Sequence, residues 1–208
     1  REAGRSEAPY LRFSYEYQIE QLAGAPVRFS FEFDQIFWDI GNDTPVSETR
    51  VAANAGFALG EKTDLLLGLN GGIVRALNDG ATRAVDRFQL GGAAFRGFAP
   101  RGIGPVDGGY FIGGNAFAVA SVELRRDIGE LFDTPAQIGV FAEAGSLWSL
   151  DNTLSGAIDD SYHIRTSVGV SMTFDISDIP VSLYVAQPIA HQESDETQAF
   201  GLTISTRF

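Results

Sequence analysis

Three side chains of the kinds that form a serine-hydrolase triad lie close together in the sequence, at Asp160, Ser161 and His163. Such a triad works only when a folded pocket aligns the nucleophile, the base and the carboxylate. These residues instead fall at the edge of a polar segment, where no such pocket is expected. The pattern therefore does not indicate catalysis, and we expect that the chain is not an enzyme.

Two acidic clusters and one glycine-rich run are the other patterns that could bind a ligand. Asp159-Asp160 and Glu193-Ser194-Asp195-Glu196 could hold calcium weakly, but solvated loop tips are the better interpretation. The run 102–114 lacks the lysine and the following helix of a phosphate-binding loop. There is no cysteine and there are only two histidines, His163 and His191, so a thiolate or multi-imidazole metal centre is not expected. The sequence predicts no cofactor and no metal.

Composition narrows the class of protein further. The 208 residues carry 15 basic and 27 acidic side chains, a formal net charge of −12, which argues against a nucleic-acid partner. The chain is rich in glycine and aromatic residues and has a single lysine, Lys62, which suits strands and turns better than helices. No apolar run approaches the length of about 20 residues that a transmembrane helix needs. Residues 1–10 lack the apolar core of a signal peptide, so either the chain is cytoplasmic or its beginning has been removed.

Apolar and polar residues alternate along much of the chain. From Leu11 to Ile19 the odd positions are apolar and the even positions are polar, and Val27 to Phe33 repeats this pattern. A period of two over such a length predicts a strand with one apolar and one polar face. The same criterion predicts about nine strands, namely Leu11–Ile19, Val27–Phe33, Arg50–Leu59, Thr63–Arg75, Asn115–Arg125, Ala136–Trp148, His163–Phe174, Val181–Pro188 and Gln198–Phe208.

The connections between these strands alternate between short and long. The short ones are Leu22–Pro26, Gly60–Thr63 and Asp175–Pro180, and the long ones are Gly41–Glu48, Ala76–Gly114, Leu150–Tyr162 and Ala190–Thr197. Asp127–Pro135 is an exception, because it is moderately long where a short turn is expected. The alternation predicts an up-and-down meander whose long loops all lie at one end.

Alternation alone does not decide which way the apolar face points. In a soluble barrel or sandwich it packs inward, whereas in an outer-membrane barrel it faces lipid and the polar face lines the lumen. Large aromatics on the apolar faces, small and charged residues on the polar faces, and an aromatic residue at the end of the last strand favour the membrane barrel. We therefore expect an all-β, antiparallel, up-and-down transmembrane barrel, with the soluble fold as the alternative.

The last predicted strand is amphipathic and stops at an aromatic residue. One face carries Phe200, Leu202, Ile204, Thr206 and Phe208, and the other begins with Gly201. This resembles the final strand of outer-membrane proteins, which acts as their assembly signal. Such a strand offers unpaired backbone groups and an apolar face, so it can join the edge of another sheet. An ordinary edge strand is the alternative.

The long connection 76–114 carries a more specific resemblance. A loop of this length is usually functional or disordered, and its regular aromatics argue against disorder. Its motifs are RFQLGG (87–92), FRGF (95–98), RGIGP (101–105) and GGNAFAVASVEL (113–124). They resemble the sixth external loop and the following strand of the BamA family, bacterial outer-membrane barrels that fold and insert other barrels. The resemblance continues in order through VFAEAGSLW (140–148), IRTSVGV (164–170), YVAQP (184–188) and the last strand.

The resemblance implies roles for five residues. In the family, the arginine of the Arg-Gly-Phe motif enters the barrel lumen and pairs with acidic residues of the inner wall. Here that arginine is Arg96, with Gly97 turning the loop and Phe98 packing in the lumen, and the matching acids are Glu123 and Glu143. Strand parity separately points both carboxylates inward, because facing lipid would cost on the order of several kcal/mol. One guanidinium has enough donors to serve both carboxylates.

Two positions depart from the family pattern. Glu143 stands where the family usually has aspartate, so the side chain is one methylene longer. Asp178-Ile179-Pro180-Val181 replaces the usual Ser-Pro-x-Gly-Pro turn. These differences loosen the assignment within the family.

The resemblance identifies residues 1–208 as the carboxy-terminal portion of a sixteen-stranded barrel, without the family's periplasmic domains. An odd number of antiparallel strands cannot close on itself, which also indicates part of a larger barrel. The implied function is an outer-membrane protein assembly factor, integral to the outer membrane, with external long loops and a periplasmic carboxy-terminus. Its partners would be the lipid bilayer, unfolded outer-membrane protein clients and accessory assembly lipoproteins. The alternatives are an autotransporter assembly factor, a two-partner secretion pore or an inert structural barrel fragment.

Overall fold

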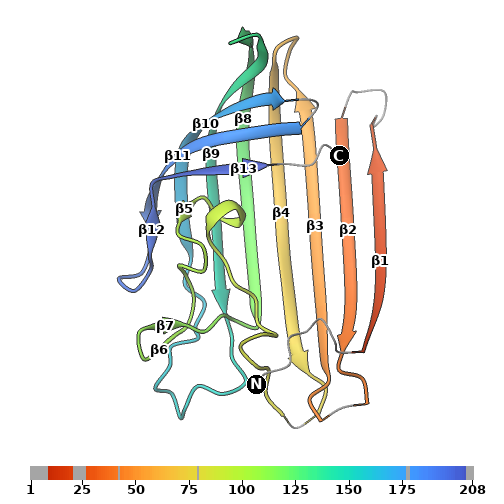
Figure 1. Cartoon of the computed structure of the whole chain (residues 1–208), viewed down its shortest axis with the longest axis vertical. Helices are drawn as coiled ribbons and strands as arrows, with labels where there is room; N and C mark the ends of the chain where they lie inside the picture. The colour runs from red at the N-terminus through yellow and green to blue at the C-terminus, as the bar shows by residue number, and fades with distance from the viewer. Residues whose placement is uncertain (1–8, 21–26, 42, 79, 177–178, 205–208) are drawn as a thin grey trace.

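The chain forms one nine-stranded antiparallel sheet. The computed structural model describes residues 9–20, 27–41, 43–78, 80–176 and 179–204. The sheet order is β1-β2-β3-β4-β8-β9-β10-β11-β13, so strands that follow one another along the chain lie side by side (Figure 1). The bounds are β1 (Tyr10–Ile19), β2 (Val27–Trp38), β3 (Val46–Ala58), β4 (Thr63–Ala76), β8 (Ala116–Leu131), β9 (Thr134–Trp148), β10 (Arg165–Ile176), β11 (Ile179–Ala190) and β13 (Phe200–Ile204). The predicted all-β meander is confirmed.

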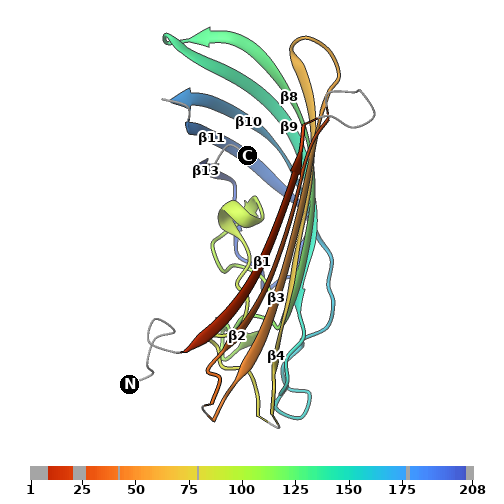
Figure 2. The ribbon, with the colours of Figure 1, turned by 90° about the vertical axis from the view of Figure 1, so that its right-hand side faces the viewer.

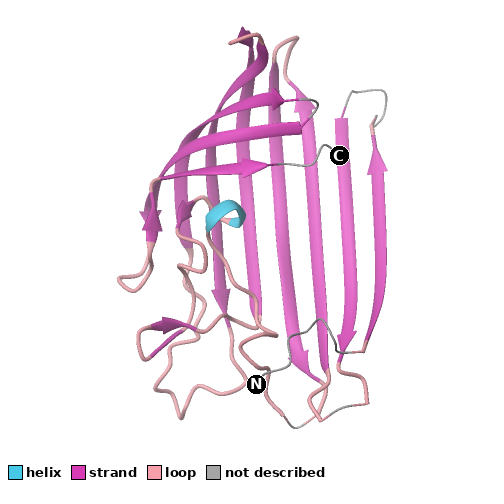
Figure 3. Cartoon of the chain, viewed as in Figure 1, coloured by secondary structure: helices cyan, strands magenta, loops and turns pink. Residues whose placement is uncertain are grey.

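The sheet is strongly curved, and the long connection between β4 and β8 lies against its concave side (Figure 2). This connection contains a 3₁₀ turn at Gly92–Ala94 and three two-residue strands, β5 (Gly97–Phe98), β6 (Val106–Asp107) and β7 (Tyr110–Phe111). Figure 3 shows that the 3₁₀ turn is the one helical segment among the described residues. No helix in the described part of the chain is long and apolar enough to cross a lipid bilayer.

The apolar face of the sheet points outward. One row of cross-strand partners crosses it from β4 to β13, through Leu65, Leu124, Val140, Val170, Val185 and Phe200. These side chains become strongly exposed toward β13, where Phe200 is 73% exposed. A soluble sandwich would bury this row. The exposed row and the covered polar face therefore match a membrane barrel.

Residues of the long connection form the core together with the concave face. The largest buried apolar cluster consists of Val46, Val74, Phe88, Leu90, Phe95, Phe98, Ile103, Val119 and Leu147. Five of these residues, from Phe88 to Ile103, come from the connection, and the other four come from the sheet or its margin. The loop and the concave face of the sheet therefore share one apolar core.

Several boundaries differ from the predicted ones. The segment 127–135 is not a moderately long connection, because β8 and β9 continue as a hairpin to a two-residue turn at Phe132 and Asp133. β3 begins at Val46, before the predicted Arg50, and β10 begins at Arg165, after the predicted His163.

The predicted last strand, Gln198–Phe208, is interrupted after Gln198. Thr197–Gln198 forms a separate strand, β12, which pairs with β5, and β13 begins at Phe200. Thr206 and Phe208 lie outside the described residues.

Candidate functional site

The loop segment that carries Arg96 reaches the sheet through close backbone packing. Gly91 has φ 123° and Gly97 has φ 96°, a region that side chains other than glycine rarely adopt. A Cβ at position 97 would lie 3.0 Å from Cβ of Ser167 on β10. Phe95 and Phe98 are fully buried, with ring centroids 4.8 Å apart. The two rings and the glycines thus fix the backbone on either side of Arg96.

Arg96 contacts both predicted acidic residues. Its Nε donates to Glu143 Oε1 at 2.7 Å, its backbone N–H donates to Glu143 Oε2 at 2.7 Å, and its Nη1 donates to Glu123 Oε2 at 3.0 Å. Arg96 is 9% exposed, and both glutamates are buried as well. Charged groups removed from water in this way are stable only when they are paired and hydrogen-bonded. The three residues therefore form a single electrostatic unit between the loop, β8 and β9.

Two further groups donate hydrogen bonds to the Glu123 carboxylate. Its Oε1 accepts a hydrogen bond from Ser171 Oγ at 2.7 Å and from Arg125 Nη2 at 3.1 Å. Two arginines thus balance two glutamates. A Cβ at Gly139 would lie only 2.6 Å from Glu123 Oε1, so a glycine at this position leaves room for the carboxylate.

Phe141 forms the floor of the site. The Arg96 guanidinium carbon lies 3.4 Å from the centroid of this ring, which is a cation–π geometry. The ring lies over Gly169 on the neighbouring strand, and it meets Tyr184 edge-on at 6.3 Å between centroids. The rings of Phe141 and Tyr184 therefore cover the concave side of the sheet from β9 to β11.

The sequence analysis did not single out Phe141, Arg125 or Ser171. Phe141 and Arg125 stand two positions from Glu143 and Glu123, so strand alternation puts each on the same face as its neighbouring acid. That signal was available in the sequence. Ser171 comes from a third strand, and its approach depends on the register between β9 and β10.

The last strand is held to β11 and carries its apolar side chains outward. β13 pairs with β11 from Val185–Phe200 to Val181–Ile204. Phe200, Leu202 and Ile204 are exposed, and Gly201 lies under the Tyr184 ring. Among the described residues, the other edge of β13 pairs with no strand.

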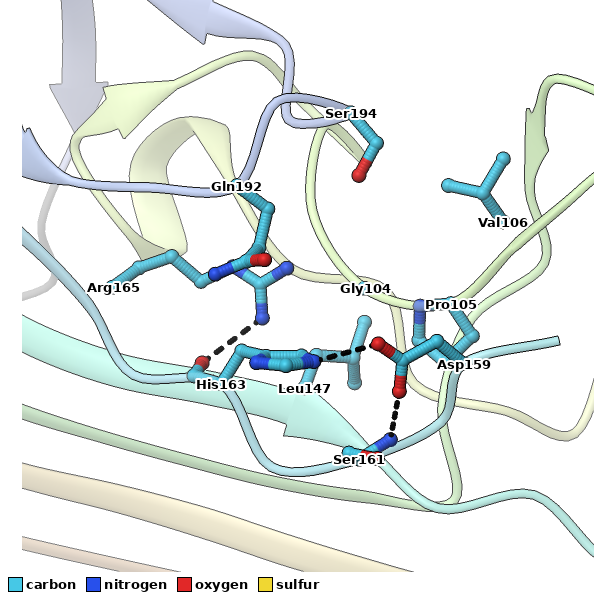
Figure 4. Close-up of a pocket in the computed structure, with 10 residues that line it drawn as sticks. All are labelled: Gly104, Pro105, Val106, Leu147, Asp159, Ser161, His163, Arg165, Gln192 and Ser194. Atoms are coloured by element: carbon cyan, nitrogen blue, oxygen red, sulfur yellow. Dashed lines mark hydrogen bonds and ion pairs between the residues drawn. The ribbon is translucent and has the colours of Figure 1, made fainter.

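A small polar pocket of about 100 Å³ lies among the loops near His163 (Figure 4). His163 Nε2 pairs with Asp159 at 2.8 Å, and Asp160 instead accepts from the backbone of Leu150. Ser161 meets Asp159 through its backbone N–H, at 3.0 Å. The side chains of Asp160, Ser161 and His163 are thus not aligned as a triad. The Ser161 N–H and the His163 ring lower the pKa of Asp159 to about 2.

In the other predicted acidic cluster, residues 193–196, Asp195 is paired with an arginine. Arg165 donates through Nε and Nη2 to the two carboxylate oxygens of Asp195, at 2.9 and 2.8 Å. Across the described ranges, no group of three or more histidine, aspartate or glutamate side chains is arranged to hold a metal ion.

Comparisons with known proteins identify the family and the fold. A profile of the Omp85 superfamily domain matches residues 8–208. A SAM50-like protein of Schizosaccharomyces pombe is 26% identical over 205 residues, which cover 93% of this chain and 43% of that protein. The crystal structure of BamA from Haemophilus ducreyi lacking POTRA domains 1–3 matches with a TM-score of 0.79 and 21% identity, over 93% of this chain and 41% of that one. The chain therefore spans less than half the length of these two proteins.

Proposed function

Because the chain belongs to the Omp85 superfamily, we propose that it is the carboxy-terminal part of the barrel of a β-barrel assembly factor. The whole protein would lie in the outer membrane, with its long loops outside and its carboxy-terminus in the periplasm. It would fold and insert unfolded outer-membrane protein clients, helped by accessory assembly lipoproteins. The similarity to a SAM50-like protein and to BamA supports an assembly role over an inert barrel.

One observation carries the proposal. β13 presents an outward apolar face and, among the described residues, an outer edge without a partner strand. Backbone N–H and C=O groups on such an edge can pair with an incoming strand. The apolar row that ends at Phe200 would then continue into the client, so that each added strand also gains a lipid-facing side.

The buried ion pairs hold the loop against the inner face of the sheet. Arg96 joins the loop to β8 and β9 through Glu123 and Glu143. β11 meets the same loop without an ion pair, through the Tyr184 hydroxyl that donates to the Gly92 carbonyl at 3.4 Å. We therefore propose that Arg96, Gly97, Phe98, Glu123 and Glu143 brace the barrel from inside while the last strand takes part in assembly.

The test is client folding by the full-length protein in liposomes. We expect it to accelerate the folding of an unfolded outer-membrane barrel at least tenfold over lipid alone, as measured by the heat-modifiable shift on gels. Arg96→Gln should remove most of the acceleration, whereas Arg101→Gln, at an exposed arginine of the same loop, should not. A full-length protein that leaves clients at the lipid-only rate would contradict the proposal, and ion conductance without client folding would favour a secretion pore.

A further inference from the structure

The junction before the last strand has two possible partners. The backbone N–H of Ala186 on β11 donates to the carbonyl of Ala199 at 2.7 Å, so the chain follows β11 back as far as Ala199. Immediately before this point it leaves the sheet. Thr197 and Gln198 pair instead with Phe98 and Gly97 of β5.

The sheet itself has room for these residues. Continuing the register beyond the Val185–Phe200 pair would place Gln198 opposite Gln187 and Thr197 opposite Pro188. β11 extends to Ala190, and its other side is already paired with β10. The alternation of side chains through 198–204 also suits one continuous strand. Pro188 weakens this continuation because it lacks the N–H that would donate to Thr197, so the Thr197–Pro188 pair can form one ladder hydrogen bond where other residues would form two. The sequence therefore leaves the extended pairing open, although it does not favour it strongly over the loop.

The loop supplies the bonds that compete with the sheet. Ala99 N–H donates to the Glu196 carbonyl at 2.9 Å, and Glu196 N–H donates to the Gly102 carbonyl at 2.8 Å. These bonds extend the pairing of β5, which directly follows Arg96, to the residues just after it. The ion pairs of Arg96 therefore hold in place the backbone that diverts 196–198.

We propose that the long connection between β4 and β8 sets the length of the last strand. While Arg96 is paired, β5 holds Thr197 and Gln198 away from β11, and the strand begins at Phe200. When the loop is released, Thr197 and Gln198 also join β11, and they lengthen the strand by about 7 Å at about 3.3 Å per residue. The significance of this switch rests on the proposed function, because a longer strand offers more edge to a client.

Paired cysteines report the two states, since the chain has no native cysteine. Ala99→Cys with Glu196→Cys reports the diverted state, and Gln187→Cys with Gln198→Cys reports the extended state. Cross-strand partners lie about 4.5–5.5 Å apart at Cα, within the range that a disulfide spans. The full-length protein in membranes is treated with copper phenanthroline in the absence of client, and crosslinked fractions are counted by peptide mass spectrometry.

We expect the 99–196 pair to crosslink in most wild-type molecules and the 187–198 pair in few. Arg96→Gln should raise the 187–198 yield at least threefold and lower the 99–196 yield. The matched control Arg101→Gln should change neither. Equal yields in Arg96→Gln and wild type would overturn the inference.

A second variant covers the case in which Arg96→Gln does not fold. Ala99→Pro removes the N–H that bonds to Glu196 and leaves every charge in place, so it too should raise the 187–198 yield. No rise in folded Ala99→Pro protein would contradict the inference. Because the crosslinks are read without client, a shift in yields combined with failed client folding would sink the proposed function and leave this inference standing.

Discussion

At the scale of single residues, Glu143 holds the loop by two different groups, the side chain and the backbone N–H of Arg96. Neutralising one member of a buried ion pair leaves the other charge uncompensated, which typically costs about 3–5 kcal/mol. We predict that Glu143→Gln lowers the free energy of unfolding by about 3 kcal/mol, measured by urea titration in detergent micelles. Glu130→Gln, at an exposed carboxylate of the β8–β9 hairpin, is the matched control and should change it little. Identical midpoints for the two variants would mean that the Glu143 pair is not formed.

Asp159 shows how a residue can be tuned without burial. Its pKa lies near 2, below its ordinary value of 3.8, because the Ser161 N–H and the His163 ring both favour the carboxylate. A lowered pKa means that these contacts stabilise the loop above about pH 4 and lose this effect as the pH falls toward 2. We predict that His163→Ala raises the Asp159 pKa, though not to 3.8, since the Ser161 bond remains. Carboxylate ¹³C NMR measures the titration, and an unchanged midpoint would exclude the His163 contact.

At the scale of elements, the β8–β9 hairpin contains its own strain. Phe132 and Asp133 have φ of 55° and 58°, the left-handed region in which type I′ turns favour Asn-Gly. The double substitution Phe132→Asn with Asp133→Gly should therefore raise the free energy of unfolding by about 1 kcal/mol. Phe132→Ala removes the 87% exposed ring without improving the turn, and we expect a much smaller change. A double variant no more stable than Phe132→Ala would contradict this explanation of the turn.

The same hairpin shows what the sequence could predict. Alternation located the nine strands because each sheet face has its own environment, and parity assigned Glu123 and Glu143 to the concave face. It did not end β8 correctly, because the turn lacks the Asn-Gly signal that marks a tight hairpin. Nor could it predict β12, whose partner β5 lies about a hundred residues earlier in the chain. Local pattern gives a residue's face, whereas contacts such as Phe141 beneath Arg96 depend on how the loop returns to the sheet.

At the scale of the whole molecule, the sheet has two edges. β1 and β13 are the outer strands of nine antiparallel neighbours, so they run in the same direction and cannot close the sheet by antiparallel pairing. β1 is exposed along almost its whole length, including Phe13 and Tyr15. Long unpaired edges pair with other chains. We predict that the 208-residue chain, refolded alone in detergent micelles, self-associates, with a protein mass by light scattering of at least twice 22.4 kDa.

The edge strand should be responsible for that association. Glu16→Lys puts a lysine on β1, a residue that discourages edge pairing between chains, and it faces Glu32 on β2, which favours the hairpin within one chain. We expect this variant to shift the population toward monomer. Glu130→Lys makes the same charge change at the β8–β9 hairpin, away from both edges, and should leave the mass distribution as it was. A wild-type chain that stays at 22.4 kDa, or an equal response of the two variants, would mean that the edges are satisfied within a single copy.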